Sequence, residues 1–512
     1  MKRMKQVVAH AVIFGLCLAT VVPGVDSDAK AKKPKLSKKT MTITQGKTKT
    51  VKLSRAGKKA KVTWSVNKKK VIKLSNKKKT SCKVKGLKKG TAVLTCKVKI
   101  SKKTYKLRCS IKVQEKKVVD TPSIINTYRN IIPNMGAAVN YGSYAPKELR
   151  TSKTLSFIKK HFNSITLENE MKPDNILGSS AKTLSVAEAK AKGYYIPEGY
   201  SEATVPQLNF TEVDGALGVA AKNGLRMRAH TLVWHSQTPG WFFTKKYEGG
   251  SVVSTTVMDA RLDFYIHNVM AHVMEKEKAL TGSTGSIVYA WDVVNEYLHR
   301  VAFGNKVWDS VYGNKGANPP YVKKAFEIAY DMLKNYGVQD KVTLFYNDYN
   351  TYFGVQQTLD LVNFINKDEK DKICGGIGMQ SHVDVKVPTV KQYGDALEKF
   401  LAAGYEIQIT ELDFTINFDT EGSSASYSYV DENETNADQK KFVKELMETI
   451  ITKQKNRDTA VNPKGITGIT LWGLCDSTSW RSSCEPLLFG TSIDDPKPSF
   501  FAFIEAVKVW GK

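Results

Sequence analysis

Hydrophobic and polar positions follow two different patterns along this chain of 512 residues. From residue 126 onward, apolar segments that end in polar or aromatic residues alternate with longer amphipathic ones such as YVKKAFEIAYDMLKNYG. The eight apolar segments are MGAAV, SITLENE, RMRAHTLVW, IVYAWDVVNE, VTLFYNDY, GIGMQSHV, EIQITELD and ITGITLWG. Eight successive β-α units predict a (β/α)8 barrel, an α/β fold, over residues 126–512.

Residues 33–115 follow the other pattern. Val, Ile, Leu and Thr alternate there with Lys in seven short runs, such as KVTWSV and TAVLTCKVKI, which are separated by Lys/Gly turns. Alternation with a period of two describes strands that bury one face. This part of the chain is therefore predicted to be a small all-β sandwich. Residues 116–125 are predicted to link it to the barrel.

The N-terminus has the pattern of a secretory signal peptide. A basic start, MKRMK, precedes the apolar run VVAHAVIFGLCLATVV and a polar stretch with a plausible cleavage site at Ser27-Asp28-Ala29. We therefore predict a signal peptide over residues 1–29 and a secreted protein with no membrane segment after cleavage. The alternative is that the apolar run stays as a membrane anchor.

The net charge of +29 belongs almost entirely to the first quarter of the chain. Residues 1–120 hold 36 Lys and Arg against 4 Asp and Glu, which leaves 42 basic and 45 acidic residues for the rest. Such a basic segment has the footprint of a nucleic-acid binder, but it has few aromatic residues and no nucleic-acid motif. We expect contact with anionic cell-wall polymers, or simple spacing of a monomeric protein from the cell surface, and no nucleic-acid partner.

Six cysteines follow the predicted signal peptide, and none has CxxC spacing, which disfavours a zinc site. Cys475 and Cys484 are close enough in sequence to close a short loop by a disulfide. Sequence alone does not fix such a pairing, so this disulfide is a guess.

Polar residues collect where the predicted barrel strands end, which is where barrel enzymes place their active sites. The set combines carboxylates, amides, imidazoles and indoles. It contains no phosphate-binding loop and no spacing typical of metal ligands, so we predict neither a cofactor nor a metal. Carboxylates, amides and Trp faces suit a neutral substrate that is rich in hydroxyl groups.

Glu296 and Glu411 carry the most specific chemistry. Each lies at the end of an apolar strand, where a charge is costly unless it is paired or functional. Hydrolysis of a glycosidic bond needs one carboxylic acid to protonate the leaving oxygen and a second carboxylate to attack carbon or to activate water. The alternative, that each is a structural ion-pair partner, fits one isolated Glu better than a pair within this set.

Seven motifs occur in the order known from glycoside hydrolase family 10, and residues 126–510 resemble that family. The motifs are LENEMK, HTLVWHSQTPGW, WDVVNE, YNDYN, GIGMQSHV, ITELD and LWGLCDSTSWR. The resemblance implies endo-β-1,4-xylanase activity. Residues 33–115 contain the segments KLSKKTMTITQGKTKTVKL and KVKGLKKGTAVLTCKV. In these segments they resemble bacterial immunoglobulin-like domains of group 2.

The family resemblance implies a role for each matching residue. Glu296 would be the acid/base and Glu411 the nucleophile. His382 would hydrogen-bond Glu411, Asp413 would orient His382, and Asn295 would contact the 2-hydroxyl of the sugar being cleaved. The residues implied to bind substrate are Glu168, Asn169, Lys172, His230, Trp234, Gln237, Gln380, Trp472 and Trp480.

The implied function is a secreted retaining endo-1,4-β-xylanase that acts on xylan and xylo-oligosaccharides. Gln237 and Trp480 match bulky residues that crowd the hydroxymethyl group of glucose, which xylose lacks. The alternatives are a β-1,4-glucanase or cellobiosidase of the same fold, and a basic adhesin with an inactive barrel. Compared with the family, residues 174–212 form a longer connection after the second strand and carry Tyr194, Tyr195 and Tyr200. This insertion is expected on the active-site side, where it would add or block subsites for the sugar chain.

Overall fold

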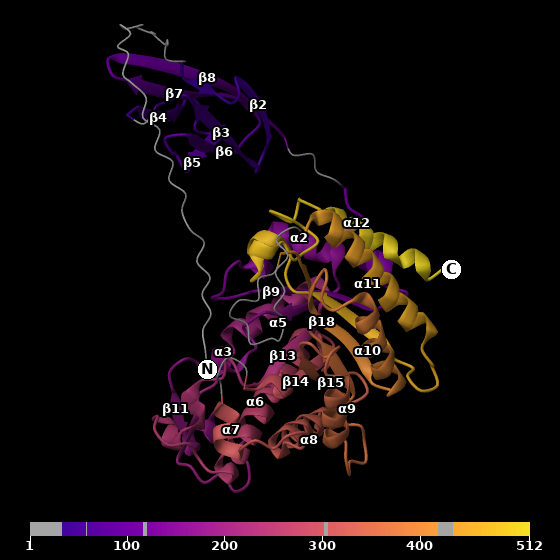
Figure 1. Cartoon of the computed structure of the whole chain (residues 1–512). Coiled ribbons are helices and arrows are strands. Elements are labelled where there is room, and N and C mark those ends of the chain that lie inside the picture. The colour runs from indigo at the N-terminus through magenta and orange to yellow at the C-terminus, as the bar shows by residue number, and fades with distance from the viewer. Residues whose placement is uncertain (1–32, 58, 116–119, 302–305, 418–433, 512) are drawn as a thin grey trace, which may run out of the picture. The chain divides into compact units, whose positions relative to one another are not determined.

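The computed structural model describes residues 33–57, 59–115, 120–301, 306–417 and 434–511 (Figure 1). The chain divides into two compact units, Met1–Lys117 and Val118–Lys512. The predicted signal peptide lies outside the described residues. Within the described part, no helix is both long and apolar enough to cross a membrane.

The first unit is all-β, as the alternation predicts. It has two four-stranded sheets, with strands in the order β1-β3-β6-β5 and β2-β8-β7-β4. The strands are β1 Lys35–Leu36, β2 Thr40–Thr44, β3 Thr48–Ser54, β4 Lys61–Val66, β5 Ile72–Ser75, β6 Ser81–Gly86, β7 Gly90–Ile100 and β8 Lys103–Gln114. Trp64 lies in the core between the apolar faces, and its Nε1 donates to Lys78 O at 2.9 Å.

The second unit is a closed barrel of eight parallel strands, which confirms the predicted fold. The order is β9-β10-β13-β14-β15-β16-β18-β19, and β19 pairs with β9 to close the ring. The strands are β9 Asn134–Val139, β10 Ser164–Leu167, β13 Arg226–Trp234, β14 Val288–Asn295, β15 Thr343–Asp348, β16 Gly376–Met379, β18 Glu406–Thr415 and β19 Ile466–Leu471. Each overlaps one of the eight predicted segments, and β17 (His382–Asp384) extends the sheet beside β18.

Helices surround the strands (Figure 1). They are α1 Ile124–Tyr128, α2 Ser152–His161, α3 Pro173–Leu177, α4 Val186–Ala191, α5 Thr211–Asn223, α6 Thr255–Thr281, α7 Val307–Tyr312, α8 Pro320–Asn335, α9 Val355–Ile365, α10 Val390–Ala402, α11 Asn436–Asn456 and α12 Pro498–Glu505. Helix α8 shows why the amphipathic stretches fold this way, because Val322, Ala325, Phe326, Ala329 and Leu333 form one buried stripe.

The long segment after β10 packs onto the outer helix α6. It contains a short hairpin of β11 (Thr183–Ser185) and β12 (Thr204–Pro206). The Tyr195 ring stacks on His267 with centroids 3.7 Å apart, and Tyr194 packs against Phe264. The Tyr200 hydroxyl lies 2.5 Å from that of Tyr247. These contacts give the three tyrosines a structural role, since they hold the segment against α6 and Tyr247.

The guess of a Cys475–Cys484 disulfide is wrong, because both residues are free buried thiols. The Cys475 sulfur lies 3.5 Å from the hydroxyls of Ser477 and Thr478. The Cys484 sulfur lies 3.8 Å from the carbonyl oxygen of Asn417. Each thiol thus has its own polar neighbours.

Glycines in β16 make room for large side chains inside the barrel. A β-carbon on Gly376 would overlap the Phe345 ring, and one on Gly378 would overlap the Asn347 amide. Arg228 and Asp292 form a fully buried ion pair in the same interior, and Arg228 Nε donates to Gln408 Oε1 at 3.0 Å. The small residues of GIGM therefore fix where the polar side chains of neighbouring strands can lie.

We predict that Gly376→Ala lowers the free energy of unfolding of the barrel by about 1–3 kcal/mol, because the added methyl group overpacks the interior. The matched control is Gly218→Ala in helix α5, where a β-carbon meets nothing within 4 Å. That change should raise stability by about 0.5–1 kcal/mol. Scanning calorimetry measures both, and an unchanged unfolding temperature for Gly376→Ala would contradict the packing argument.

Candidate active site

The two glutamates lie at the carboxyl ends of β14 and β18. Glu296 follows the last residue of β14 and has φ 59°, in the left-handed region that few residues other than glycine adopt. Glu411 lies within β18 and is 5 % exposed. The barrel thus presents both carboxyls at the end where the sequence places the polar residues.

Glu411 is held by donors on two sides. Asn347 Nδ2 donates to its Oε1 at 2.9 Å, and His382 Nε2 lies 3.2 Å from its Oε2. Burial alone would raise the pKa of Glu411. The hydrogen bond to His382 and the positive potential of His230, His382 and Lys172 outweigh burial and lower this pKa to about 2. Glu411 is therefore an ionised carboxylate.

His382 depends in turn on Asp413. Its Nδ1 lies 2.9 Å from Asp413 Oδ2. Burial opposes a charged imidazole, but the charge and hydrogen bond of Asp413, with the bond to Glu411, raise the pKa of His382 to about 9. His382 is thus an imidazolium that donates to both carboxylates.

Glu296 has the opposite protonation. Trp234 Nε1 donates to its Oε2 at 2.7 Å and Gln380 Nε2 to its Oε1 at 2.8 Å. Burial, aided by the negative charge of Asp348, raises the pKa of Glu296 to about 7, despite those two hydrogen bonds. Near neutral pH this carboxyl therefore retains a proton that it can donate.

Amides connect the two carboxyls. Asn347 Nδ2 donates to Asn295 Oδ1 at 2.9 Å as well as to Glu411, and Gln380 Nε2 lies 3.2 Å from Asn295 Oδ1. Thr410 Oγ1 donates to Asn347 Oδ1 at 2.6 Å, which fixes the orientation of the Asn347 amide. Asn295 Nδ2 is buried and has no hydrogen-bond partner among the residues that the structure describes, so it is a donor that remains available.

A second group of polar residues lies beside Trp234. Lys172 Nζ donates to Gln237 Oε1 at 2.9 Å and lies 4.8 Å from the centre of a Trp234 ring. Gln237 Nε2 donates to Asn169 Oδ1 at 3.3 Å. Burial lowers the pKa of Lys172, although nearby Glu411, Glu168 and Glu296 oppose that shift.

Glu168 joins this group through Asn140, a residue that the sequence reasoning missed. Asn140 Nδ2 donates to Glu168 Oε2 at 2.7 Å, and its Oδ1 accepts from Asn169 at 3.3 Å. Asn140 follows β9 directly, and a single Asn after a short apolar strand gives no signal of its own.

Indoles and imidazoles form the remaining wall. The ring centres of His230 and Trp472 are 5.7 Å apart, and His230 Nδ1 lies 2.8 Å from Asp292 Oδ2. Trp480 Nε1 donates to Asp413 Oδ2 at 3.2 Å, while 56 % of Trp480 remains exposed. The Arg481 guanidinium lies 4.4 Å from the centre of the Trp480 ring, and the His382 ring centre lies 4.9 Å away, so several contacts hold this half-exposed indole in place.

The structure therefore brings all fourteen predicted site residues into one connected arrangement. Asn347 and Asp348 belong to the YNDYN motif but are not among the fourteen residues. The structure places Asn347 between Asn295 and Glu411, and Asp348 raises the pKa of Glu296. Among the described residues, no group of three or more His, Cys, Asp and Glu has the arrangement of a metal site.

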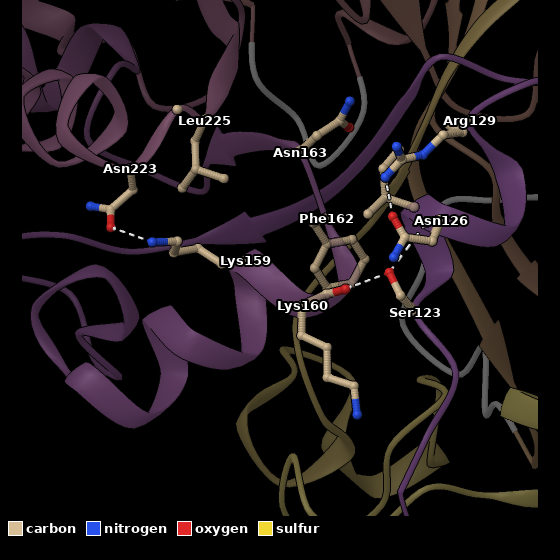
Figure 2. A pocket seen from close by; sticks show the side chains of 11 residues that line it. Ser123, Asn126, Arg129, Lys159, Lys160, Phe162, Asn163, Asn223 and Leu225 are labelled. Atoms are coloured by element: carbon tan, nitrogen blue, oxygen red, sulfur yellow. Dashed lines mark hydrogen bonds between the residues drawn. The ribbon is translucent and has the colours of Figure 1, made fainter.

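A pocket of about 700 Å³ lies at the other end of the strands, and it does not share this chemistry (Figure 2). Asn163 and Leu225, which line it, directly precede β10 and β13. Lys159 Nζ donates to Asn223 Oδ1 at 3.3 Å, and Ser123 Oγ donates to Lys160 O (Figure 2). Its lysines complement the C-terminus of α2, so helix stabilisation explains them.

One protonated and one ionised carboxyl at the mouth of a (β/α)8 barrel are the pair that a glycoside hydrolase needs. The chain belongs to glycosyl hydrolase family 10, because the model of that family matches residues 124–506. It is 42% identical over 381 residues to endo-1,4-beta-xylanase A of Butyrivibrio fibrisolvens, an alignment that covers 74% of this chain and 84% of that relative. It is 34% identical to endo-1,4-beta-xylanase A of Thermotoga maritima, over 66% of this chain and 27% of that relative.

Solved structures have the same fold. The CBM22-1–GH10 modules of a Clostridium thermocellum endo-1,4-beta-D-xylanase, complexed with xylohexaose, match with a TM-score of 0.56 and 25% identity over 83% of this chain and 72% of that one. A GH10 xylanase from termite gut that contains a bacterial Ig-like domain matches with a TM-score of 0.57 and 20% identity, over 92% and 99% of the two chains. At 20% identity, this second likeness concerns the fold alone.

We predict that His382→Gln moves the acid limb of the pH profile of kcat/KM to higher pH, by about one pH unit. The substitution removes a hydrogen bond and a positive charge that keep the pKa of Glu411 low, so Glu411 becomes protonated at a higher pH. His272→Gln, at an imidazole paired with Asp214 on the outer helices, is the control. If the rate falls but the acid limb does not move, His382 orients Glu411 without setting its ionisation.

We predict that Asp348→Asn changes the other limb of the pH profile of kcat/KM, in the opposite direction. Removing this negative charge lowers the pKa of Glu296, so the alkaline limb of kcat/KM should move to lower pH, again by about one pH unit. Asp340→Asn, at an exposed position just before β15, is the matched control at the opposite end of the same strand. An unshifted alkaline limb in Asp348→Asn would mean that burial alone sets the pKa of Glu296.

Proposed function

We propose that this protein is a secreted retaining endo-1,4-β-xylanase that hydrolyses internal linkages of xylan by double displacement. The observation that carries the proposal is the opposite protonation of two buried carboxyls within one hydrogen-bond network. Glu296 has a pKa of about 7 and Glu411 one of about 2. The names of the Butyrivibrio and Thermotoga relatives support xylan as the substrate.

In the first step, an Oε of Glu411 attacks the anomeric carbon while Glu296 gives its proton to the leaving glycosidic oxygen. The bond from the anomeric carbon to that oxygen breaks, and an ester to Glu411 forms. Asn347 and His382 hold Glu411 ionised and aimed. Asn295 Nδ2, which has no other partner, donates to the 2-hydroxyl, a contact that should tighten in the oxocarbenium-like transition state.

In the second step, Glu296 is a carboxylate and removes a proton from water. The water oxygen attacks the anomeric carbon, the ester bond breaks, and Glu411 leaves as a carboxylate. Two inversions give net retention, which requires the two carboxyls to lie roughly 5–5.5 Å apart. Glu296 regains its proton and is ready for the next cycle.

We assign the preference for xylose over glucose to two bulky side chains, those of Gln237 and Trp480. Gln237 is held between Lys172 and Asn169, and Trp480 is held by Asp413. Fixed side chains at these positions would meet the hydroxymethyl group that glucose carries and xylose lacks. A preference for cellulose or mixed-linkage glucan is the alternative within the same fold.

We propose further that the first unit is an immunoglobulin-like domain, that the leader directs secretion, and that the mature protein is a monomer that contacts the cell wall through this domain. The two packed four-stranded sheets and the buried Trp64 support the domain assignment. The basic start and apolar run of residues 1–29 support secretion. The excess of lysine supports contact with an anionic wall.

The decisive experiment compares the products of wild type and Glu411→Ala on arabinoxylan and on carboxymethylcellulose. Wild type should release xylo-oligosaccharides from arabinoxylan, and Glu411→Ala should lower kcat by a factor on the order of 10⁴. Glu398→Ala, at an exposed carboxylate of helix α10, is the control that should retain full activity. Activity on cellulose alone would overturn the assignment of Gln237 and Trp480, and inactivity on both would favour an inactive barrel.

The stereochemistry of the product gives an independent prediction. Proton NMR of a xylo-oligosaccharide digest should show the β-anomer first, with the α-anomer appearing only as mutarotation proceeds, because two displacements at one carbon restore its configuration. An α-anomer formed first would mean that Glu411 activates water instead of attacking carbon.

A further inference from the structure

The outer face of the sheet β2-β8-β7-β4 carries a dense group of cations. Side chains of a strand point alternately to its two faces, and Leu94, Cys96 and Val98 of β7 are buried in the core. Lys97 and Lys99 of the same strand therefore point outward. We define the basic block as five of the exposed outward cations on three neighbouring strands: Lys61, Lys97, Lys99, Lys106 and Arg108.

The strand register places like charges directly opposite one another in this block. Lys61 pairs with Lys99 across β4 and β7, and Lys97 pairs with Lys106 across β7 and β8. Like charges at directly opposed positions destabilise a sheet. Glu115 is the one acidic residue of the sequence 33–115, and it pairs with Lys89 at 2.9 Å. The repulsion within the block is therefore not balanced by acidic neighbours, which points to an external partner.

The other outward residues near the block limit the kind of partner. Thr63, Ser65, Thr95 and Thr104 alternate with the cations, and this part of the face carries no aromatic ring. It offers no surface for stacking on sugar rings or on bases. Recognition must therefore rest on charge and on hydroxyl hydrogen bonds.

The spacing of the cations further limits which anionic polymer can bind the block. Cations two residues apart on a strand are about 6.6–6.8 Å apart, and neighbouring strands lie about 4.7–4.9 Å apart. A block this dense suits a flexible polymer with a negative charge in every short repeat. A polysaccharide with occasional uronic acids presents its charges too far apart to engage the block at several points at once.

We propose that the basic block is the binding surface for an anionic phosphodiester polymer of the cell wall, an inference that rests on the proposed secretion and wall contact. The block forms several phosphate contacts at once, and each contact releases counterions. Binding should therefore weaken steeply as salt rises. The block thus localises the enzyme by its first unit and takes no part in hydrolysis.

The test uses two full-length variants with the same change in net charge. The block variant combines Lys61→Thr, Lys97→Thr, Lys99→Thr and Lys106→Thr. The control variant combines four exposed lysines that lie outside the strands of the first unit, and its changes are Lys38→Thr, Lys68→Thr, Lys77→Thr and Lys88→Thr. At about 50 mM salt, immobilised poly(glycerol phosphate) should bind the block variant about tenfold or more weakly than wild type, with a shallower salt dependence. The control should stay within about threefold of wild type.

Equal losses in both variants would overturn the proposal, because binding would then follow total charge and not the block. Equally tight binding of wild type to RNA or to polygalacturonate would overturn the assignment to a phosphodiester of the wall. Xylan hydrolysis is measured on the same samples. If wild type binds the polymer but hydrolyses no xylan, the proposed catalytic function is refuted and the proposed binding surface is not. If wild type hydrolyses xylan but does not bind the polymer, only the proposed binding surface is refuted.

Discussion

The difference in protonation between Glu296 and Glu411 is the constraint on which the rest of the active site depends. Two buried carboxyls with the same charge would repel each other, and two neutral ones could not attack carbon. The donors around Glu411, chiefly the His382 imidazolium, keep it ionised, whereas burial and the charge of Asp348 keep the proton on Glu296. Asn347 holds Glu411, and Trp234 and Gln380 hold Glu296, through the hydrogen bonds that they donate to the two carboxyls.

Side chains in the barrel interior hold the residues of the active site in position. Asp292 accepts from the buried Arg228 and also lies 2.8 Å from His230, so an ion pair of the core orients a residue of the site wall. Gly378 leaves the space in which Asn347 reaches both Asn295 and Glu411. The same strands therefore carry both the packed interior of the barrel and the active site. A side chain that shifts in the interior would displace the site residue that it contacts.

The apolar segments of the sequence predict the barrel and its eight strands, and the structure confirms both. The resemblance to the family implies the fourteen site residues, and the structure places them together at one end of the strands. The sequence did not reveal the roles of Asn347 and Asp348, which depend on hydrogen bonds and charges across neighbouring strands. The sequence also gives no sign of the contacts that Tyr194 and Tyr195 make with Phe264 and His267 of α6, because these partners are far apart along the chain and no local pattern indicates them. The supposed disulfide failed for the same reason, since proximity in sequence does not fix the direction of a thiol.

The most direct test of this account is a carbon NMR titration of the glutamate side-chain carboxyls in the free enzyme, with Glu296→Gln and Glu411→Gln used to assign the two signals. The account predicts that the Glu296 carboxyl titrates near pH 7 and that the Glu411 carboxyl remains ionised down to the lowest pH at which the protein is folded. Two signals that both titrate near the ordinary glutamate value of about 4.3 would contradict it.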